Sequence, residues 1–282
     1  MKQKIKEAMD LAGRFKFFFK PPGKSFLMGS HMGSGEGQSL DYHDFRPYYP
    51  GDDLRKIDWN SYARTGQLSV SVYRKEIVPR IDIFLDDSAS MGFQKDKRQF
   101  CLMLAYFFLN LFKNSGYSSR LFLGKQFLSK ARKINEWDGE EFFSNKHWHR
   151  EMGQYLKAFS SKRACLLIIS DLLFQVNPKE FIFNLKTSAS SMLVVQLNSF
   201  AEESPSLAGY FSLTDIESGE EKNVVINLEK IRNYRRKFMN LRESYFELCR
   251  GQEIPFFHVN SSSTLKEFCA DVLIPAGLLR QL

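Results

Sequence analysis

Apolar segments of strand length alternate with helical patterns from residue 80 to the C-terminal region of the chain. This alternation is typical of a doubly wound, mostly parallel α/β sheet with helices on both faces. The expected strands are 80–86, 120–123, 126–128, 164–170, 192–197 and 255–259. The expected helices lie near 96–114, 140–159, 178–189 and 228–250, and a last helix starts at Thr264, with Ser262 or Ser263 as its cap.

The sequence predicts one large α/β domain and a smaller extension. Residues 80–282 form the α/β domain, into which a β-hairpin is inserted near 198–227. Residues 1–79 form an N-terminal extension with a dense block of Arg, Asp and aromatic residues. In this block Pro50 and Gly51 suit a type II turn, and the Asp and Arg side chains are expected to bind backbone groups and each other. The alternatives for the block are a partner surface and an active site.

A cluster of oxygen-bearing side chains follows the first strand of the α/β domain. Asp86, Ser88 and Ser90 occupy alternate positions, so one carboxylate and two hydroxyls can point to the same side of an extended segment. Such oxygen ligands suit Mg²⁺ or Mn²⁺ and do not suit a soft metal. The alternative interpretation is that these side chains cap or turn the chain ahead of the next helix.

A further aspartate, Asp171, follows the continuous apolar run 164–170. Such a run is typical of a strand in the middle of a parallel sheet that is covered on both faces. Asp86 and Asp171 therefore leave the carboxyl ends of two buried strands. In open α/β sheets ligands bind at this edge, where the strand order reverses. The predicted metal ligands are Asp86, Ser88, Ser90 and Asp171.

Composition argues against several other classes of protein. The four cysteines lie far apart in apolar patterns, which indicates reduced core residues. His147 and His149 lack a third zinc ligand at metal spacing. The net charge of +8 comes without a recognisable nucleic-acid-binding motif, so nucleic acid is not an expected partner. With no signal-peptide pattern and no apolar run of bilayer length, a cytoplasmic location is expected.

Two blocks of the sequence resemble a known family. Residues 45–59, Phe-Arg-Pro-Tyr-Tyr-Pro-Gly-Asp-Asp-Leu-Arg-Lys-Ile-Asp-Trp, and the following Ala63-Arg64-Thr65 resemble the signature of the bacterial domain-of-unknown-function family fifty-eight. Residues 85–91 resemble the metal-ion-dependent adhesion site of von Willebrand factor A domains, a fold to which that family is related. The similarity covers nearly the whole chain from about residue 27.

The resemblance implies an interaction protein. Family members are often linked with MoxR-type AAA+ ATPases, for which they are thought to act as adaptors or co-chaperones. In von Willebrand factor A domains the Asp-x-Ser-x-Ser loop, a Thr and a later Asp hold the metal, and an acidic side chain of a partner fills the open coordination position. The positions that match are Asp86, Ser88, Ser90 and Asp171. Because no Thr occurs between Met91 and Asp171, its place falls to water, to a serine such as Ser144, or to nothing.

We therefore expect a non-enzymatic, metal-dependent protein-interaction module. Its expected partner is a protein with an acidic group, such as an AAA+ ATPase, and its expected cofactor is Mg²⁺ or Mn²⁺. The first alternative is an Mg-assisted hydrolase of a phosphate ester. The second alternative is a metal-free structural scaffold, which the missing Thr would favour.

Overall fold

The structure is a computed structural model that describes ten segments of the chain. They are residues 1–19, 32–36, 42–76, 80–123, 126–128, 152, 164–174, 176–189, 191–216 and 219–282. The chain divides into two compact units, one formed by Met1–Gly23 with Arg80–Leu282 and one formed by Lys24–Pro79. The helix expected near 140–159 lies outside the described residues apart from Met152, and so do His147, His149 and Ser144.

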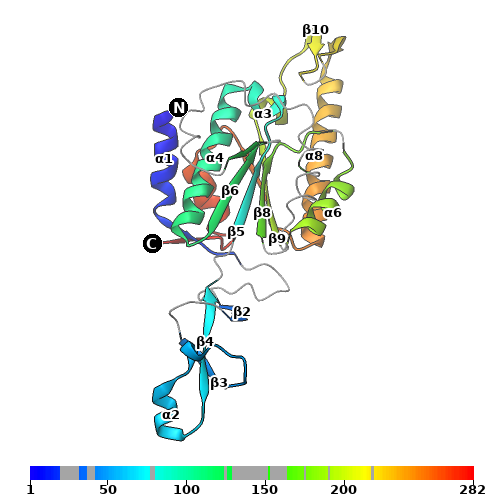
Figure 1. Cartoon of the computed structure of the whole chain (residues 1–282). Helices are drawn as coiled ribbons and strands as arrows, with labels where there is room; N and C mark the ends of the chain where they lie inside the picture. Colours follow the sequence, from blue (N-terminus) through cyan, green and yellow to red (C-terminus); the bar gives the residue numbers. More distant parts are fainter. Residues whose placement is uncertain are drawn as a thin grey trace. The chain divides into compact units, whose positions relative to one another are not determined.

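The first unit is built on a six-stranded sheet (Figure 1). Its strands are β5 (Arg80–Leu85), β6 (Ser118–Leu123), β7 (Gln126–Leu128), β8 (Ala164–Ser170), β9 (Ser191–Asn198) and β12 (Phe256–Asn260). Their order is β12-β9-β8-β5-β6-β7. Neighbours from β12 to β6 are parallel, and β7 pairs antiparallel with β6. This confirms the predicted α/β class with a mostly parallel sheet.

The strand order reverses between β5 and β8. From β5 the chain first adds β6 on one side, and it then crosses back to add β8 on the other side. The helices that follow β5 and β8 therefore cover opposite faces of the sheet, and a crevice is expected between the two strand ends. This reversal sets the position of the candidate site.

Helices cover both faces of the sheet. On one face, α1 (Lys2–Ala12) packs against α4 (Lys95–Asn114), and on the other face lie α6 (Pro178–Ser188) and α8 (Leu228–Gly251) (Figure 1). Successive strand residues point to opposite faces, so Ile83 joins the core under α4 whereas Phe84 joins the core under α6 and α8. Burial on both faces explains why the strands read as continuous apolar runs.

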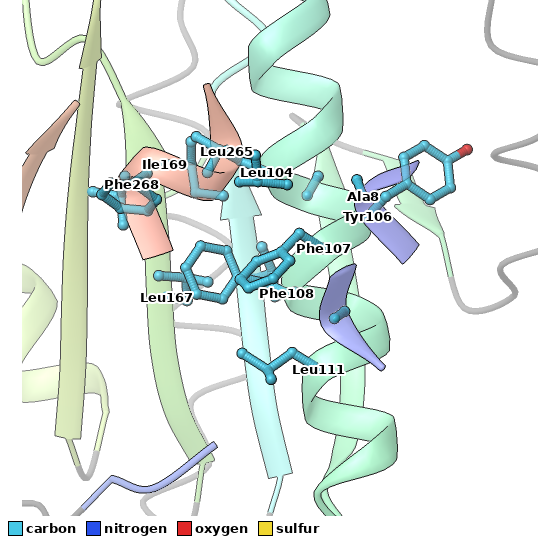
Figure 2. Packing of buried hydrophobic residues seen from close by; sticks show 14 of the residues in the cluster. Ala8, Leu104, Tyr106, Phe107, Phe108, Leu111, Leu167, Ile169, Leu265 and Phe268 are labelled. Atoms are coloured by element: carbon cyan, nitrogen blue, oxygen red, sulfur yellow. The ribbon is translucent and has the colours of Figure 1, made fainter. Parts of the chain in front are cut away.

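The larger core lies between α4 and the sheet. Figure 2 shows Leu104, Phe107 and Phe108 of α4 facing Leu167 and Ile169 of β8. All five side chains are buried. Fully burying a side chain of this size stabilises the fold by about 1.5–3 kcal/mol relative to exposing it, so α4 is a principal contributor to the stability of this unit.

The N-terminal and C-terminal segments of the first unit meet in a small sheet. Strand β1 (Phe15–Phe17) pairs antiparallel with β13 (Leu279–Gln281). Residues 1–23 thus belong to the α/β unit, although the sequence analysis grouped them with the extension 1–79. The apolar side of α1, with Ile5 and Leu11, is buried in the core beside α4, which accounts for this placement.

The last helical segment begins at α9 (Leu265–Glu267) and continues as the π-helical turn η4 (Phe268–Leu273). Its cap is Thr264, so the prediction of Ser262 or Ser263 was wrong. The Thr264 hydroxyl accepts the Glu267 N–H, and the Glu267 carboxylate accepts the Thr264 N–H, because a Glu stands three residues after the Thr. Ser262 instead donates to Asn260 Oδ1.

Between β9 and α8 the chain forms the short helix α7 (Phe200–Glu203) and two further strands. Strands β10 (Gly209–Thr214) and β11 (Glu221–Ile226) pair with each other in antiparallel register. Most of their side chains are exposed, so this pair contributes little to the core. In Figure 1 it lies beyond the sheet, at the same end as α3 (Ala89–Phe93).

The second unit contains a three-stranded antiparallel sheet. Its elements are β2 (Met32–Glu36), β3 (Tyr42–Pro47), η1 (Leu54–Lys56), α2 (Trp59–Thr65) and β4 (Ser69–Glu76), with sheet order β2-β4-β3.

The Arg46 guanidinium donates two hydrogen bonds to Asp52, at 2.6 and 2.7 Å. Gly51 has φ +107°, as position three of a type II turn requires. Asp58 caps α2 by accepting the Ser61 N–H. These contacts support the structural reading of the Arg and Asp block.

Two further properties concern the described residues as a whole. None of their helices is long and apolar enough to cross a membrane. Cys101, Cys165, Cys249 and Cys269 are buried free thiols, in agreement with the reduced core cysteines that the sequence predicted.

The packing of α4 generates a testable prediction. Leu104→Ala removes a fully buried side chain and leaves a cavity, so we expect the free energy of unfolding in urea to fall by about 2–5 kcal/mol. Met239→Ala is the control, because Met239 lies on α8 with half of its surface exposed, and its effect should stay below about 0.5 kcal/mol. Equal losses for the two variants would contradict the packing of α4 against the sheet.

Candidate functional site

The loop that follows β5 and the start of α3 carry three of the four predicted metal ligands. The Asp86 N–H donates to the carbonyl of Ile169, which extends the pairing of β5 with β8 by one residue. Asp86 Oδ1 then accepts the Ser88 N–H at 2.9 Å, and this tight turn leads into α3. The hydroxyls of Ser88 and Ser90 lie 3.0 Å apart. Asp86 therefore does shape the turn, but Ser88, at the N-cap position of α3, makes no capping bond with its side chain.

The parallel register of β5 and β8 brings the fourth residue to the same edge. Leu85 pairs with Ile169, so the residues after them, Asp86 and Ser170, leave the sheet side by side. The Ser170 hydroxyl donates to Asp86 Oδ2 at 2.5 Å. Asp171 follows directly, and both aspartates are only 1% exposed. The structure thus places the predicted residues at one edge, and it adds Ser170, which the sequence analysis did not single out.

Both oxygens of Asp171 are already hydrogen bonded. Oδ1 accepts the Leu173 N–H at 3.0 Å, and Oδ2 accepts from the ammonium of Lys97 at 2.7 Å. Between them Leu172 has φ +57°, a left-handed conformation that is unusual for a branched apolar residue. The Leu172 N–H donates to the Ser170 hydroxyl, so this strained turn is held by polar groups of the site itself.

Lys97 is a component of the site that the sequence analysis missed. Its side chain is fully buried, and its ammonium donates to Asp171 Oδ2, to Glu202 Oε1 at 2.6 Å and to the Ser90 carbonyl at 3.3 Å. An ammonium has three N–H donors, and these three acceptors use all of them. Lys97 therefore joins α4, the end of β8 and α7 in one buried ionic contact.

Glu202 is held in place by α7. Its other carboxylate oxygen accepts the N–H of Ser199, and the Ser199 hydroxyl accepts the N–H of Glu202, which together form a capping box at the start of α7. The Tyr234 hydroxyl of α8 donates to the Glu202 carbonyl at 2.8 Å. Glu202 is therefore anchored from two sides and presents one carboxylate oxygen to Lys97.

A sequence signal could have identified Lys97. The buried face of α4 includes Cys101, Leu104, Phe108 and Leu111, at alternating spacings of three and four residues. Lys97 stands four residues before Cys101 and continues this apolar stripe toward the N-terminus of the helix. A lysine on the core face of a helix requires a buried acidic partner, because an unpaired charge in the core is strongly disfavoured.

The electrostatics of the site follow from its burial. Burial, and then the negative charge of Asp171, raise the pKa of Asp86 from 3.8 to about 7. Burial by itself would lower the pKa of Lys97, but the charges of Asp171 and Glu202 outweigh it, and the pKa of Lys97 is raised. Among the described residues of the site there are more acidic groups than positive charges, and within this set Lys97 pairs with Asp171 and not with Asp86.

The donor set of the site fits a hard divalent cation. Neighbouring ligands of an octahedral ion with bonds of about 2.1 Å lie about 3 Å apart, which agrees with the 3.0 Å between the Ser88 and Ser90 hydroxyls. The raised pKa of Asp86 also indicates a carboxylate that would gain from a nearby positive charge. Among the residues that the structure describes, no group of three or more His, Cys, Asp or Glu side chains is arranged to hold a metal. The candidate site accordingly depends on hydroxyls as well as carboxylates.

A comparison with known protein families bears on the resemblance to the domain-of-unknown-function family fifty-eight. Residues 44–125 match the model of a family described as "Protein of unknown function DUF58", which confirms that resemblance. No curated protein matches the chain. Among solved structures, the conserved hypothetical protein BatB from Bacteroides thetaiotaomicron is similar, with 13% sequence identity and a TM-score of 0.38 over 71% of this chain and 98% of that chain.

The raised pKa of Asp86 predicts a pH-dependent stability. Because the folded state holds this proton more tightly than the unfolded state, the stabilisation is complete below the ordinary pKa of 3.8 and is lost as the pH rises through about 7. Asp86→Asn removes this titration. In buffer with a chelator, we expect the variant to gain about 2 kcal/mol relative to the wild type between about pH 5 and pH 8, as measured by urea unfolding. A difference that does not change with pH would contradict the effect of burial on the pKa of Asp86.

Proposed function

We propose that this chain, which matches the DUF58 family over residues 44–125, is a non-enzymatic protein-interaction module that uses Mg²⁺ or Mn²⁺. The metal would be held by Asp86, Ser88, Ser90 and Asp171. The observation that carries the proposal is the convergence of these oxygen donors where the strand order reverses, with two hydroxyls at the spacing of adjacent metal ligands.

The residues around these ligands would orient them. Asp86 is fixed through both of its oxygens, by the Ser88 N–H and by the Ser170 hydroxyl. Ser88 and Ser90 are held at the start of α3, where their hydroxyls contact each other. When bound, the metal would supply a positive charge with an exchangeable water, which a carboxylate of a partner can replace. With few protein carboxylates on the ion, this exchange is not opposed by excess negative charge.

Exposed aromatic side chains next to the site support a protein as the partner. Phe93 at the end of α3 is 74% exposed, and Phe200 at the start of α7 is 65% exposed. These helices carry Ser90 and Glu202, so each phenylalanine stands within three residues of a group at the site. Aromatic residues are enriched in protein interfaces, and a partner that brings an acidic side chain to the metal would also cover them.

The family resemblance suggests which partner this is. We propose a MoxR-type AAA+ ATPase in the cytoplasm, for which the chain would act as an adaptor. We propose binding and not catalysis, and the pairing of Lys97 with Glu202 supports this, because neither charged group is then available as a general acid or base.

The central test is the metal dependence of partner binding. Asp86→Ala removes a proposed ligand, and we expect it to weaken the Mg²⁺-dependent binding of a purified MoxR-type ATPase by roughly tenfold or more, measured by calorimetry. Asp96→Ala is the matched control, because Asp96 is an exposed aspartate in the first turn of α4 and should bind like the wild type. Circular dichroism checks that both variants are folded.

Other results would select the alternatives. Binding that is insensitive to EDTA and to Asp86→Ala would indicate a metal-free scaffold. Turnover of a panel of phosphate esters that is lost with EDTA and with Asp86→Ala would indicate a hydrolase.

A further inference from the structure

We propose that the ammonium of Lys97 competes with the metal for Asp171. When the metal binds Asp171, Lys97 gives up its contact with Asp171 and stays paired with Glu202. The inference rests on the proposed metal-dependent function and describes how that site is regulated. It starts from the buried contact of Lys97 with Asp171 Oδ2 at 2.7 Å and with Glu202 Oε1 at 2.6 Å.

The competition follows from the geometry of Asp171. One of its oxygens is engaged by the Leu173 N–H and the other by the Lys97 ammonium, which also contacts the Ser90 carbonyl at 3.3 Å. A cation of the chain therefore lies between Asp171 and the start of α3, which carries the two proposed serine ligands. A divalent ion that used Asp171 would stand close to this ammonium, and repulsion between like charges would disfavour having both at once.

Glu202 makes the release of Asp171 feasible. A buried ammonium cannot be left without an acidic partner, but Lys97 has two. If the metal takes over Asp171, the lysine keeps its charge paired through Glu202. The capping box fixes the carboxylate of Glu202 at the start of α7, so this second partner remains in place.

The same contact connects the metal to the surface. Glu202 belongs to α7, which exposes Phe200, and the Glu202 carbonyl is tied to Tyr234 of α8. If Lys97 moves from its position between Asp171 and Glu202 to pair with Glu202 alone, its ion pair with α7 changes close to the exposed Phe200. Metal binding and partner binding would then favour each other, because both act on one ionic contact, and linkage makes such coupling reciprocal.

The test compares the affinity for Mn²⁺ of the full chain with and without the lysine charge. Lys97→Met keeps most of the side-chain volume and removes the ammonium, so we expect Mn²⁺ to bind roughly tenfold more tightly by calorimetry, with a larger rise of Tm on adding Mn²⁺. Lys113→Met is the matched control, because Lys113 is exposed on the same helix and should bind Mn²⁺ like the wild type.

A second pair of variants separates the competition from a general effect of charge. Within the described part of the chain, Glu202→Gln leaves Asp171 as the carboxylate that pairs with Lys97, so Mn²⁺ should bind several-fold more weakly than to the wild type. In the Lys97→Met background the same change should have little further effect, because the lysine that transmits it is gone. The double variant has one unpaired buried carboxylate fewer than Lys97→Met, because Glu202 is replaced by a neutral amide. It therefore tests the proposal if Lys97→Met by itself fails to fold.

The outcomes distinguish this inference from the proposed function. If the wild type binds Mn²⁺, Asp86→Ala abolishes that binding and Lys97→Met leaves the affinity unchanged, the site stands and the role of Lys97 is overturned. An equal effect of Glu202→Gln with and without Lys97 would also overturn it. If Lys97→Met binds Mn²⁺ and the wild type does not, the result would support a competition in which Lys97 excludes the metal completely. If neither protein binds Mn²⁺ or Mg²⁺, the metal site and the inference both fail.

Discussion

Negative charge is buried at the carboxyl edge of the sheet, and this end of the molecule is arranged around that burial. Asp86 and Asp171 follow adjacent strands and are almost completely buried, which is costly for carboxylates unless they are paired. The Lys97 ammonium neutralises Asp171 directly. Asp86 receives hydrogen bonds from Ser170 and from the Ser88 N–H, and burial still raises its pKa to about 7. One carboxylate is therefore compensated by the chain, and the other is left ready to gain from an added cation.

This arrangement depends on the topology of the sheet. The two aspartates become neighbours because the strand order reverses between β5 and β8, and the parallel register aligns their ends. Lys97 reaches Asp171 because α4 packs along one face of the sheet and begins near the loop after β5. Glu202 reaches Lys97 because α7 follows β9, the next strand along the sheet. Four elements thus contribute to one small cluster of charge.

The cluster also bears on function, because a site with an internal cation behaves differently from an open acidic pocket. The proposed metal ligands Ser88 and Ser90 are neutral, so the affinity for a divalent ion depends mainly on the two aspartates. With Lys97 on Asp171, the affinity of the proposed site for a divalent ion would be lower than the number of its carboxylates suggests. Such a site suits conditional binding, in which a partner's carboxylate and the metal arrive together. The absence of a Thr between Met91 and Asp171 would lower this affinity further, because the proposed site would have one oxygen ligand fewer than the von Willebrand pattern.

The sequence by itself determined the α/β class, the main strands and the two strand-end aspartates, because continuous apolar runs and helical periodicity are local properties of the chain. It did not reveal that residues 1–23 belong to the α/β unit, since a short strand such as β1 gains its stability from pairing with β13 at the other end of the chain. The sequence analysis did not single out Lys97, although it continues the apolar stripe of α4. Its partners are 74 and 105 residues away. Only the tertiary structure could join these three side chains, because the energy of a buried ion pair depends on distance in space and on exclusion of water, and neither is encoded in local sequence spacing.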